Sequence, residues 1–244
     1  MKNSNKIILF ATIALLSTLI AYNFSLKAEY LTSKYKDPFY NYTTLNYKAF
    51  SKVKIGAGNL LDVKIVKGDK FDIKVQKRVE LSLTVKKNGS LLTINVKDTT
   101  AYFRAGDKAI LITCPTITDL AIDAQRTTFY NSRDSSISEY QDQYDRKVIL
   151  EGFSLQKLNI IQGRNNTVKL NRNTIGRLTA LTGNNDKMGS KLIVGSDNLI
   201  EEAHLSTNNK NELVLNTTIK NLHLNYTDSA SITLQGSALS LLKK

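Results

Sequence analysis

The chain has 244 residues, of which 41% are hydrophobic and 23% are charged, and its formal net charge is +13. These proportions are ordinary for a folded protein and exclude general disorder. The single cysteine, Cys114, excludes an internal disulfide and a metal cluster held by cysteines. Because Cys114 ends an apolar stretch, we expect it to be a buried side chain.

Residues 1–28 have the character of a signal peptide or of a single-pass membrane anchor. Two lysines precede an apolar run from Ile7 to Tyr22, which is the usual order of an export signal. The run falls just short of the roughly 17–25 residues that span a bilayer comfortably. A signal cleavage site has small residues at the last position of the signal and two positions earlier. Ala21 and Ala28 could each be the last residue, but Leu19 and Leu26 stand two positions before them. Both alternatives stay open, and both place the rest of the chain in the cell envelope, outside the cytoplasm, whether membrane-anchored, periplasmic or at the cell surface.

Residues 29–48 are expected to form a spacer, and residues 49–244 a single β domain. The spacer is rich in tyrosine and poor in aliphatic residues. Tyrosine favours membrane interfaces, and it equally suits the end of a β domain.

Short strands with one buried face are predicted between residues 50 and 115, because apolar and polar residues alternate there. Asn88-Gly89 is typical of a tight hairpin, so this part is expected to begin with antiparallel pairing. Lysines fill the polar positions, as in Val53-Lys54-Ile55, and they should face solvent. The apolar positions are Val53/Ile55, Val63/Ile65, Phe71/Ile73/Val75, Leu83/Val85, Leu92/Ile94/Val96 and Ile110/Ile112.

Most of the excess positive charge lies before residue 101. A basic surface could attract anionic lipid, acidic polysaccharide or nucleic acid. Export argues against nucleic acid, and the lysines lack an aromatic stacking platform. We therefore expect no nucleic-acid partner.

Residues 156–236 contain four copies of a repeat of about 20 residues. Each copy has two apolar-x-apolar strands that are separated by a polar turn. The turns hold paired asparagines, which tolerate the left-handed backbone region. The strands centre on Asn159, Thr179, His204 and His223 for the first of each pair, and on Lys169, Ile193, Val214 and Thr233 for the second.

The same pattern extends upstream as one more copy, Leu120–Ile122 with Val148–Leu150. Its turn is enlarged by the polar residues 126–146, which are either a functional excursion or a tolerated insertion. A shorter insertion lies at residues 186–189.

Strands this short cannot bury a face alone, whereas stacked copies share one apolar interior. The sequence therefore predicts an all-β domain, a parallel β-solenoid or β-helix with coils of about 20 residues. A hydrophobic helix at the N-terminus precedes it. A solenoid of helices is disfavoured, because the apolar period is 2 and not 3.6.

Residues 48–240 resemble the head GIN domain family of auto-transporter adhesins. The resemblance rests on Phe50–Ile55, on Val63–Asp69, on Gly89–Ile94 and on Ile110–Pro115. The chain departs from the family after the proline, where glycine- and serine-rich repeats are usual and residues 121–126 are not of that kind. The resemblance implies a cell-envelope location and an adhesive role, and it offers no catalytic residues.

Two histidines, His204 and His223, are the main candidates for metal chemistry. They occupy equivalent positions in consecutive copies, so both should point outward and stack. A catalytic zinc site usually takes three protein ligands, and no acid stands at that position in the neighbouring copies. We therefore expect a solvent-exposed ladder and no metal or cofactor.

Enzyme chemistry is not expected. Polysaccharide-active β-helices need clustered carboxylates on one face, and acids are sparse in the repeats. The adjacent Glu201 and Glu202 cannot both face inward. Motifs of hydrolases, P-loop proteins, metalloproteases and dinucleotide-binding proteins are missing from the sequence.

An interaction surface is predicted on the second strands, where Ile193 and Val214 form an apolar stripe on an otherwise polar face. With His204 and His223 they make up our candidate interaction residues. The sequence favours a non-catalytic binding or adhesion module whose partner is an envelope protein or a glycan. Two alternatives are a structural or assembly component of the envelope and a polysaccharide-active enzyme.

Overall fold

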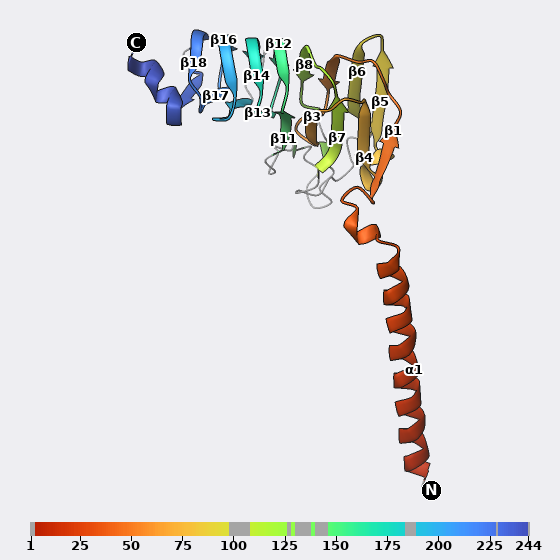
Figure 1. The fold of residues 1–244 in the computed structure, drawn as a ribbon. Helices are drawn as coiled ribbons and strands as arrows, with labels where there is room; N and C mark the ends of the chain where they lie inside the picture. Colours follow the sequence, from red (N-terminus) through yellow and green to blue (C-terminus); the bar gives the residue numbers. More distant parts are fainter. Residues whose placement is uncertain are drawn as a thin grey trace. The chain divides into compact units, whose positions relative to one another are not determined.

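The computed structural model describes residues 3–97, 108–125, 128–129, 138–139, 146–183, 189–227 and 229–243 (Figure 1). The chain divides into two compact units, Met1–Tyr42 and Thr43–Lys244. The predicted insertion at residues 126–146 lies outside the described residues except for 128–129, 138–139 and 146. The insertion at residues 186–189 likewise lies outside them, except for Gly189.

The first unit consists of the helix α1 (Asn3–Leu31) and the short 3-10 helix η1 (Lys34–Lys36). Glycine and proline are absent from the sequence of α1, so nothing in it disfavours a continuous helix. The helix ends where Ser33 adopts a left-handed backbone conformation, with φ of 54°. None of its residues is buried, and it is long and apolar enough to cross a membrane, as a signal sequence can also be.

The second unit is built from two large sheets. The helix α2 (Lys77–Glu80) joins two strands, and the 3-10 helix η2 (Gly236–Lys243) follows the last strand. A separate pair joins β9 (Thr128–Phe129) and β10 (Ser138–Glu139). In spatial order, the nine-stranded sheet contains β1 (Tyr42–Leu45), β4 (Asp72–Gln76), β7 (Lys108–Cys114), β3 (Asp62–Lys67), β11 (Lys147–Glu151), β13 (Thr167–Asn171), β15 (Lys191–Val194), β17 (Glu212–Leu215) and β19 (Ser231–Leu234). The eight-stranded sheet contains β18 (Ile219–Tyr226), β16 (Leu199–Thr207), β14 (Thr174–Thr182), β12 (Ser154–Gln162), β8 (Asp119–Ile122), β2 (Lys52–Ile55), β6 (Leu91–Val96) and β5 (Leu83–Asn88).

The prediction of an all-β parallel β-solenoid is wrong. The fold is a mixed one of helices and two large mixed sheets, and these sheets do not close into a solenoid. Strand β4 runs antiparallel to β7, and β5 runs antiparallel to β6. The period of 2 specifies strands and their buried faces, but it carries no information on strand direction or on whether two sheets close.

The strands and their register are predicted correctly in the C-terminal part. Leu158 pairs with Leu178, and the row continues through Ala203 to Leu222. All neighbouring strands in this row are parallel. Inward side chains of both sheets form one hydrophobic core, to which Phe50 and Phe153 contribute the largest buried side chains. The repeat therefore does define which residues meet, although not the closure of the sheets.

Several local predictions for the second unit are confirmed. Cys114 is fully buried at the end of β7. The predicted tight hairpin joins β5 to β6: Asn88 pairs with Leu91, and the turn between them is Gly89, at a positive φ, and Ser90. Asn165 and Asn209 adopt the left-handed conformation in their turns.

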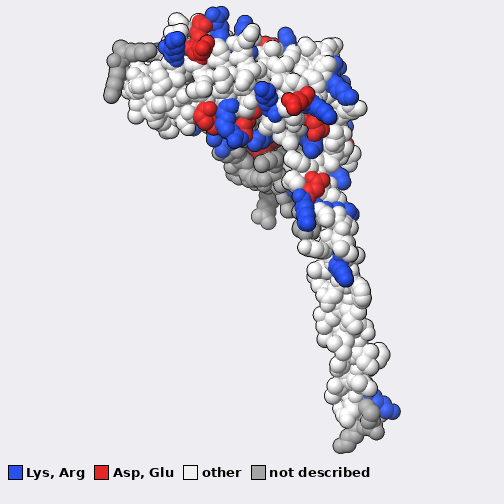
Figure 2. All heavy atoms as spheres, in the orientation of Figure 1, with Lys and Arg blue, Asp and Glu red and all other residues white. Residues whose placement is uncertain are grey.

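The lysines predicted to face solvent do so in β2, where Lys52 and Lys54 are exposed between buried Val53 and Ile55. Figure 2 shows basic and acidic side chains interspersed on the visible face of the second unit. Salt bridges such as Lys52–Asp119 contribute to this mixture. Along α1 the same view shows a long uncharged surface.

Buried asparagines line the chain just before β14 and β16. Asn173 and Asn198 are each only 1% exposed. The side-chain oxygen of Asn198 accepts hydrogen bonds from the backbone and side-chain nitrogens of Asn173, both at 3.0 Å. The side-chain nitrogen of Asn198 donates to the carbonyl oxygens of Leu170 and Gly195, both at 2.8 Å. These bonds satisfy polar groups that would otherwise be buried without partners.

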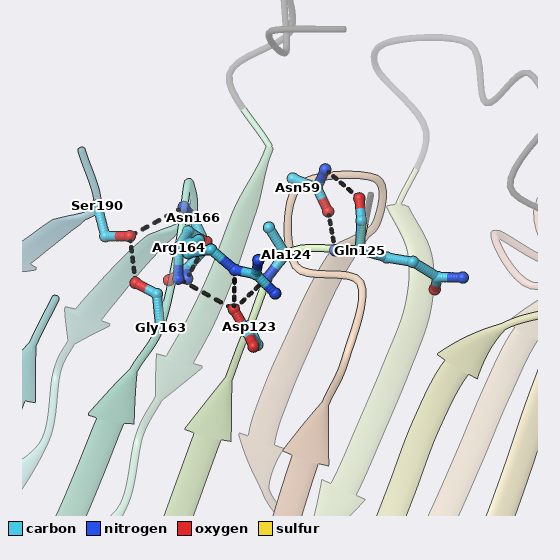
Figure 3. A network of polar contacts seen from close by, with 8 residues as sticks. All are labelled: Asn59, Asp123, Ala124, Gln125, Gly163, Arg164, Asn166 and Ser190. Carbon is cyan, nitrogen blue, oxygen red and sulfur yellow. Dashed lines mark hydrogen bonds and ion pairs between the residues drawn. The ribbon is translucent and has the colours of Figure 1, made fainter. Parts of the chain in front are cut away.

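A polar network ties the N-terminal half of the second unit to the C-terminal half (Figure 3). Asp123 follows β8, and its Oδ1 accepts hydrogen bonds from the backbone nitrogens of Ala124 at 2.8 Å and Arg164 at 3.0 Å. Asn59 is bonded in both directions to the backbone of Gln125. The network fixes β8 between segments that are distant in sequence, and so sets the position of the strands that follow.

Candidate functional site

The strands β12, β14, β16 and β18 share one irregularity at the same place. The pairing of Leu155 with Ile175 is followed by that of Lys157 with Arg177, so one residue on each strand has no partner. The same gap recurs in the two following strand pairs. The register is the same on both sides of the gap, and in β12 the successive residues Gln156 and Lys157 are both exposed, where strict alternation would bury one of them. We call the four residues the irregular row: Gln156, Gly176, Glu201 and Lys220.

A groove of about 840 Å³ runs along the irregular row. Its deepest apolar lining comes from the buried residues Leu155, Ile175 and Ile200. Gly176 contributes to the hollow because it places no side chain in the row. Leu199 stands at the groove and is 69% exposed. The remaining lining residues are polar: Ser154, Gln156, Thr174, Glu201, Thr218 and Lys220.

The groove therefore joins an aliphatic floor to a rim of hydroxyl, amide and charged groups. Ligand sites commonly have this composition, with a few polar groups that fix orientation over an apolar surface. Glu201 and Lys220 bring one negative and one positive charge to the rim. Because the groove crosses four strands about 4.8 Å apart, it accommodates an elongated group about 14 Å long.

A cluster of ionisable side chains on β14, β16 and β18 begins at Glu202, the residue that follows Glu201 of the groove. His204 and His223 are paired across β16 and β18, and their rings stack with centroids 4.5 Å apart and planes 16° apart. The predicted stacking of the two histidines is thus confirmed. Glu202 joins them: its Oε1 lies 2.7 Å from Nε2 of His204. The Nε of Arg177 donates to Oε2 of Glu202, also at 2.7 Å.

The hydrogen bonds from His204 and then from Arg177 lower the pKa of the Glu202 carboxyl. Both donors stabilise the ionised form of the acid. Glu202 is therefore a carboxylate at neutral pH, and the nitrogen of His204 that faces it carries the proton. The cluster combines an anionic oxygen with two imidazole rings, which are typical ligands of transition metals.

Glu202 and Arg177 are functional candidates that the sequence reasoning missed. For a metal site, the prediction considered only the row Asn159, Thr179, His204 and His223, which the structure extends to Asp119 on β8. Glu202 lies two residues before His204 on the same strand, and it points to the same face. The spacing Glu-x-His in a strand was the available signal, since residues two apart point to one side.

The predicted apolar stripe is not an exposed surface. Ile193 and Val214 are indeed paired neighbours in β15 and β17. However, Val214 is only 6% exposed and Ile193 is half-buried. An outward position on a strand does not ensure exposure, because the chain around the strand also determines how much water reaches it. The structure brings His204 and His223 together, but the other two candidates lie in the other sheet.

Neither a family model nor a curated protein matches this chain. Solved structures from three bacteria are similar to it over most of their length. A "putative adhesin" from Bacteroides fragilis has 14% identity, covers 79% of this chain and 96% of its own, and has a TM-score of 0.46. A "putative adhesin" from Parabacteroides merdae has 9% identity, with 79% and 95% covered and a TM-score of 0.39. A "putative lipid binding protein" from Parabacteroides distasonis has 11% identity, with 80% and 94% covered and a TM-score of 0.34. Likeness at this level identifies no family, and membership of the head GIN domain family stays a prediction.

Proposed function

We propose that the chain is a non-catalytic binding module of the cell envelope that is held to a membrane by α1. Its groove on the eight-stranded sheet would bind an elongated apolar segment of another envelope protein. The observation that carries this proposal is the groove itself, with its aliphatic floor and mixed polar rim. The β unit supplies the binding surface, and the helix supplies the location.

The length of α1 is compatible with the membrane anchor that we propose, and a signal sequence passes the same test. A helix of 29 residues is about 43 Å long, which exceeds the hydrocarbon core of about 30 Å. The helix is continuous through Ala21 and Ala28, where a signal could end. N-terminal sequencing of the protein from its native membrane tests this point. Retention of residues 1–28 is the expected result, and a start near residue 22 or 29 would contradict it.

The lining of the groove favours a protein segment over a glycan. Its described residues are aliphatic or polar, and none of them is aromatic. Aliphatic floors suit apolar side chains, whereas sugar rings are commonly held against aromatic faces. The charged pair at the rim, Glu201 and Lys220, can pair with opposite charges or with backbone groups of an extended peptide.

Two variants with matched chemistry test the groove. Leu199→Glu places a charge in the groove, whereas Leu81→Glu places the same charge at another exposed leucine, 86% accessible, next to α2. Full-length protein in nanodiscs is incubated with whole cells, with solubilised envelope proteins and with a glycan array. We expect saturable binding to an envelope protein, weakened at least about tenfold by Leu199→Glu and unchanged by Leu81→Glu.

Other outcomes of the same experiment would change the assignment. Saturable binding to a glycan would overturn the choice of partner. Equal binding by both variants would remove the groove from the site. Turnover of a glycan would overturn the non-catalytic proposal. Binding to no component, by a protein that is still membrane-bound, would favour a structural role in the envelope.

A further inference from the structure

We propose that Glu202, His204 and His223 form a binding site for a divalent transition-metal ion, with Zn²⁺ as the typical occupant. The site lies on the outward face of β16 and β18, and its three residues do not line the groove. The sequence led us to expect no metal because the row of the histidines holds no nearby acid. The structure supplies that acid from Glu202, two residues before His204 on β16.

The geometry of the three side chains supports this assignment. Each offers one ligand atom, and these atoms all lie within 4.8 Å of one another. A tetrahedral zinc ion with bonds of about 2.0–2.2 Å holds its ligand atoms about 3.3 Å apart. The 2.7 Å between Glu202 and His204 must therefore lengthen slightly, and longer separations must shorten. Exposed side chains make such changes by rotation about their χ angles, without movement of the strands.

The strands hold the two imidazoles in place. His204 and His223 are registered partners in neighbouring parallel strands, and their backbones are fixed by the pairing of β16 with β18. The rings already stack almost parallel, so their nitrogens can reach one point beyond the ring edges. Glu202 lies two residues before His204 and therefore points to the same side. Two elements of regular structure thus preorganise all three ligands.

Arg177 orients the carboxylate from behind. Its Nε holds Oε2 of Glu202, which leaves Oε1 directed at His204. Hydrogen bonds from neighbouring residues commonly fix the orientation of a metal ligand in this way. Without metal, the proton on Nε2 of His204 occupies the position in front of Oε1. A metal ion bound at Nε2 takes that position, and the neutral imidazole then carries its proton on Nδ1.

The ligand types select the class of metal. Imidazole nitrogens suit Zn²⁺, Cu²⁺ and Ni²⁺, whereas Ca²⁺ and Mg²⁺ prefer sites made of oxygens. Three protein ligands leave a fourth position for water or for a donor from outside the protein. Because Glu202 and His204 are partly accessible to solvent, this position opens outward.

Zinc titration of the untagged, full-length protein in nanodiscs tests the proposal. Isothermal calorimetry is expected to give one Zn²⁺ per chain and no heat from Mg²⁺. Substitution of Co²⁺ should produce the visible absorption of a tetrahedral site. The variants His204→Asn, His223→Asn and Glu202→Gln should each weaken zinc binding at least about tenfold. Asparagine suits this row, since Asn159 occupies it in β12.

Thr179→Ala is the matched control, because Thr179 lies in the row of the histidines but outside the proposed ligand set. It should bind zinc as the unaltered protein does. Circular dichroism of each variant establishes that its strands are retained. Zinc binding of equal strength in all four variants, or no binding by the unaltered protein, would overturn the proposal.

Discussion

Gly176 lies so close to the backbone oxygen of Gln156 that a Cβ at residue 176 would be 2.8 Å from it. Real Cβ atoms are essentially never this close to a backbone atom, so a side chain here must displace β12 or β14. The two strands therefore pack this closely only because residue 176 has no side chain, and the same absence leaves the groove hollow at this position.

Replacement of Gly176 by alanine should lower the free energy of unfolding by about 1–3 kcal/mol, the usual cost of forcing an added group into a packed site. Urea denaturation followed by circular dichroism measures the change. Glu201→Ala is the control, since Glu201 occupies the same row in β16 and already carries a Cβ. Equal stability of Gly176→Ala and the unaltered protein would show that the strands separate without cost.

Replacement of Asn198 by alanine should be more damaging. It removes the acceptor for two nitrogens of Asn173 and the donor for two carbonyl oxygens, all in a buried corner. The side-chain nitrogen of Asn173 and the two carbonyl oxygens keep another partner, whereas the backbone nitrogen of Asn173 is left unpaired. Three lost bonds at about 0.5–1.5 kcal/mol each and one unpaired group at about 1–3 kcal/mol give an expected loss of at least about 3 kcal/mol. Thermal unfolding provides the measurement. The exposed Asn221→Ala should change stability by less than about 0.5 kcal/mol, and a similar small effect at Asn198 would contradict the role of the corner.

The thiol of Cys114 should not react in the folded protein. Burial raises its pKa to about 12, so at pH 8 only about one thiol in ten thousand is ionised. The side chain is also inaccessible to reagents. Ellman's reagent should therefore detect no thiol in native protein and one per chain in guanidinium chloride. Fast modification under native conditions would show that β7 opens readily.

Asp119 should make stability depend on acid pH. Burial acts to raise the pKa of its carboxyl, but hydrogen bonds from Asn159 and Thr118, together with Lys52, outweigh it and hold the pKa below the ordinary value of 3.8. A carboxyl with a lowered folded-state pKa stabilises the fold above the unfolded-state pKa. That contribution is lost as the pH falls through the folded-state pKa.

Acid unfolding of the Asp119→Asn variant should therefore show a weaker dependence on pH below about 4 than the unaltered protein. Titration of the Asp119 carboxyl carbon by NMR measures the pKa directly. A midpoint at or above 3.8 would be inconsistent with the hydrogen bonds from Asn159 and Thr118.

Periodicity alone determined much of the second unit. The alternation of apolar and polar residues located the strands, buried Cys114 and set the register that stacks His204 on His223. These properties are local, because side chains of a strand alternate between its faces whatever lies beside it. The apolar run near the N-terminus likewise predicted α1 without reference to any partner.

Only the tertiary structure decided how the strands are combined. Nothing in the sequence of β4 specifies that it runs antiparallel to the distant β7, so a solenoid was expected where two mixed sheets are found. The burial of Val214 and the approach of Arg177 to Glu202 have the same origin. Strand order and strand direction depend on how loops connect distant segments of the chain. Small irregularities of the strands add to this. The resulting arrangement brings together side chains that are far apart in the sequence, and the sequence alone gives no sign of their contact.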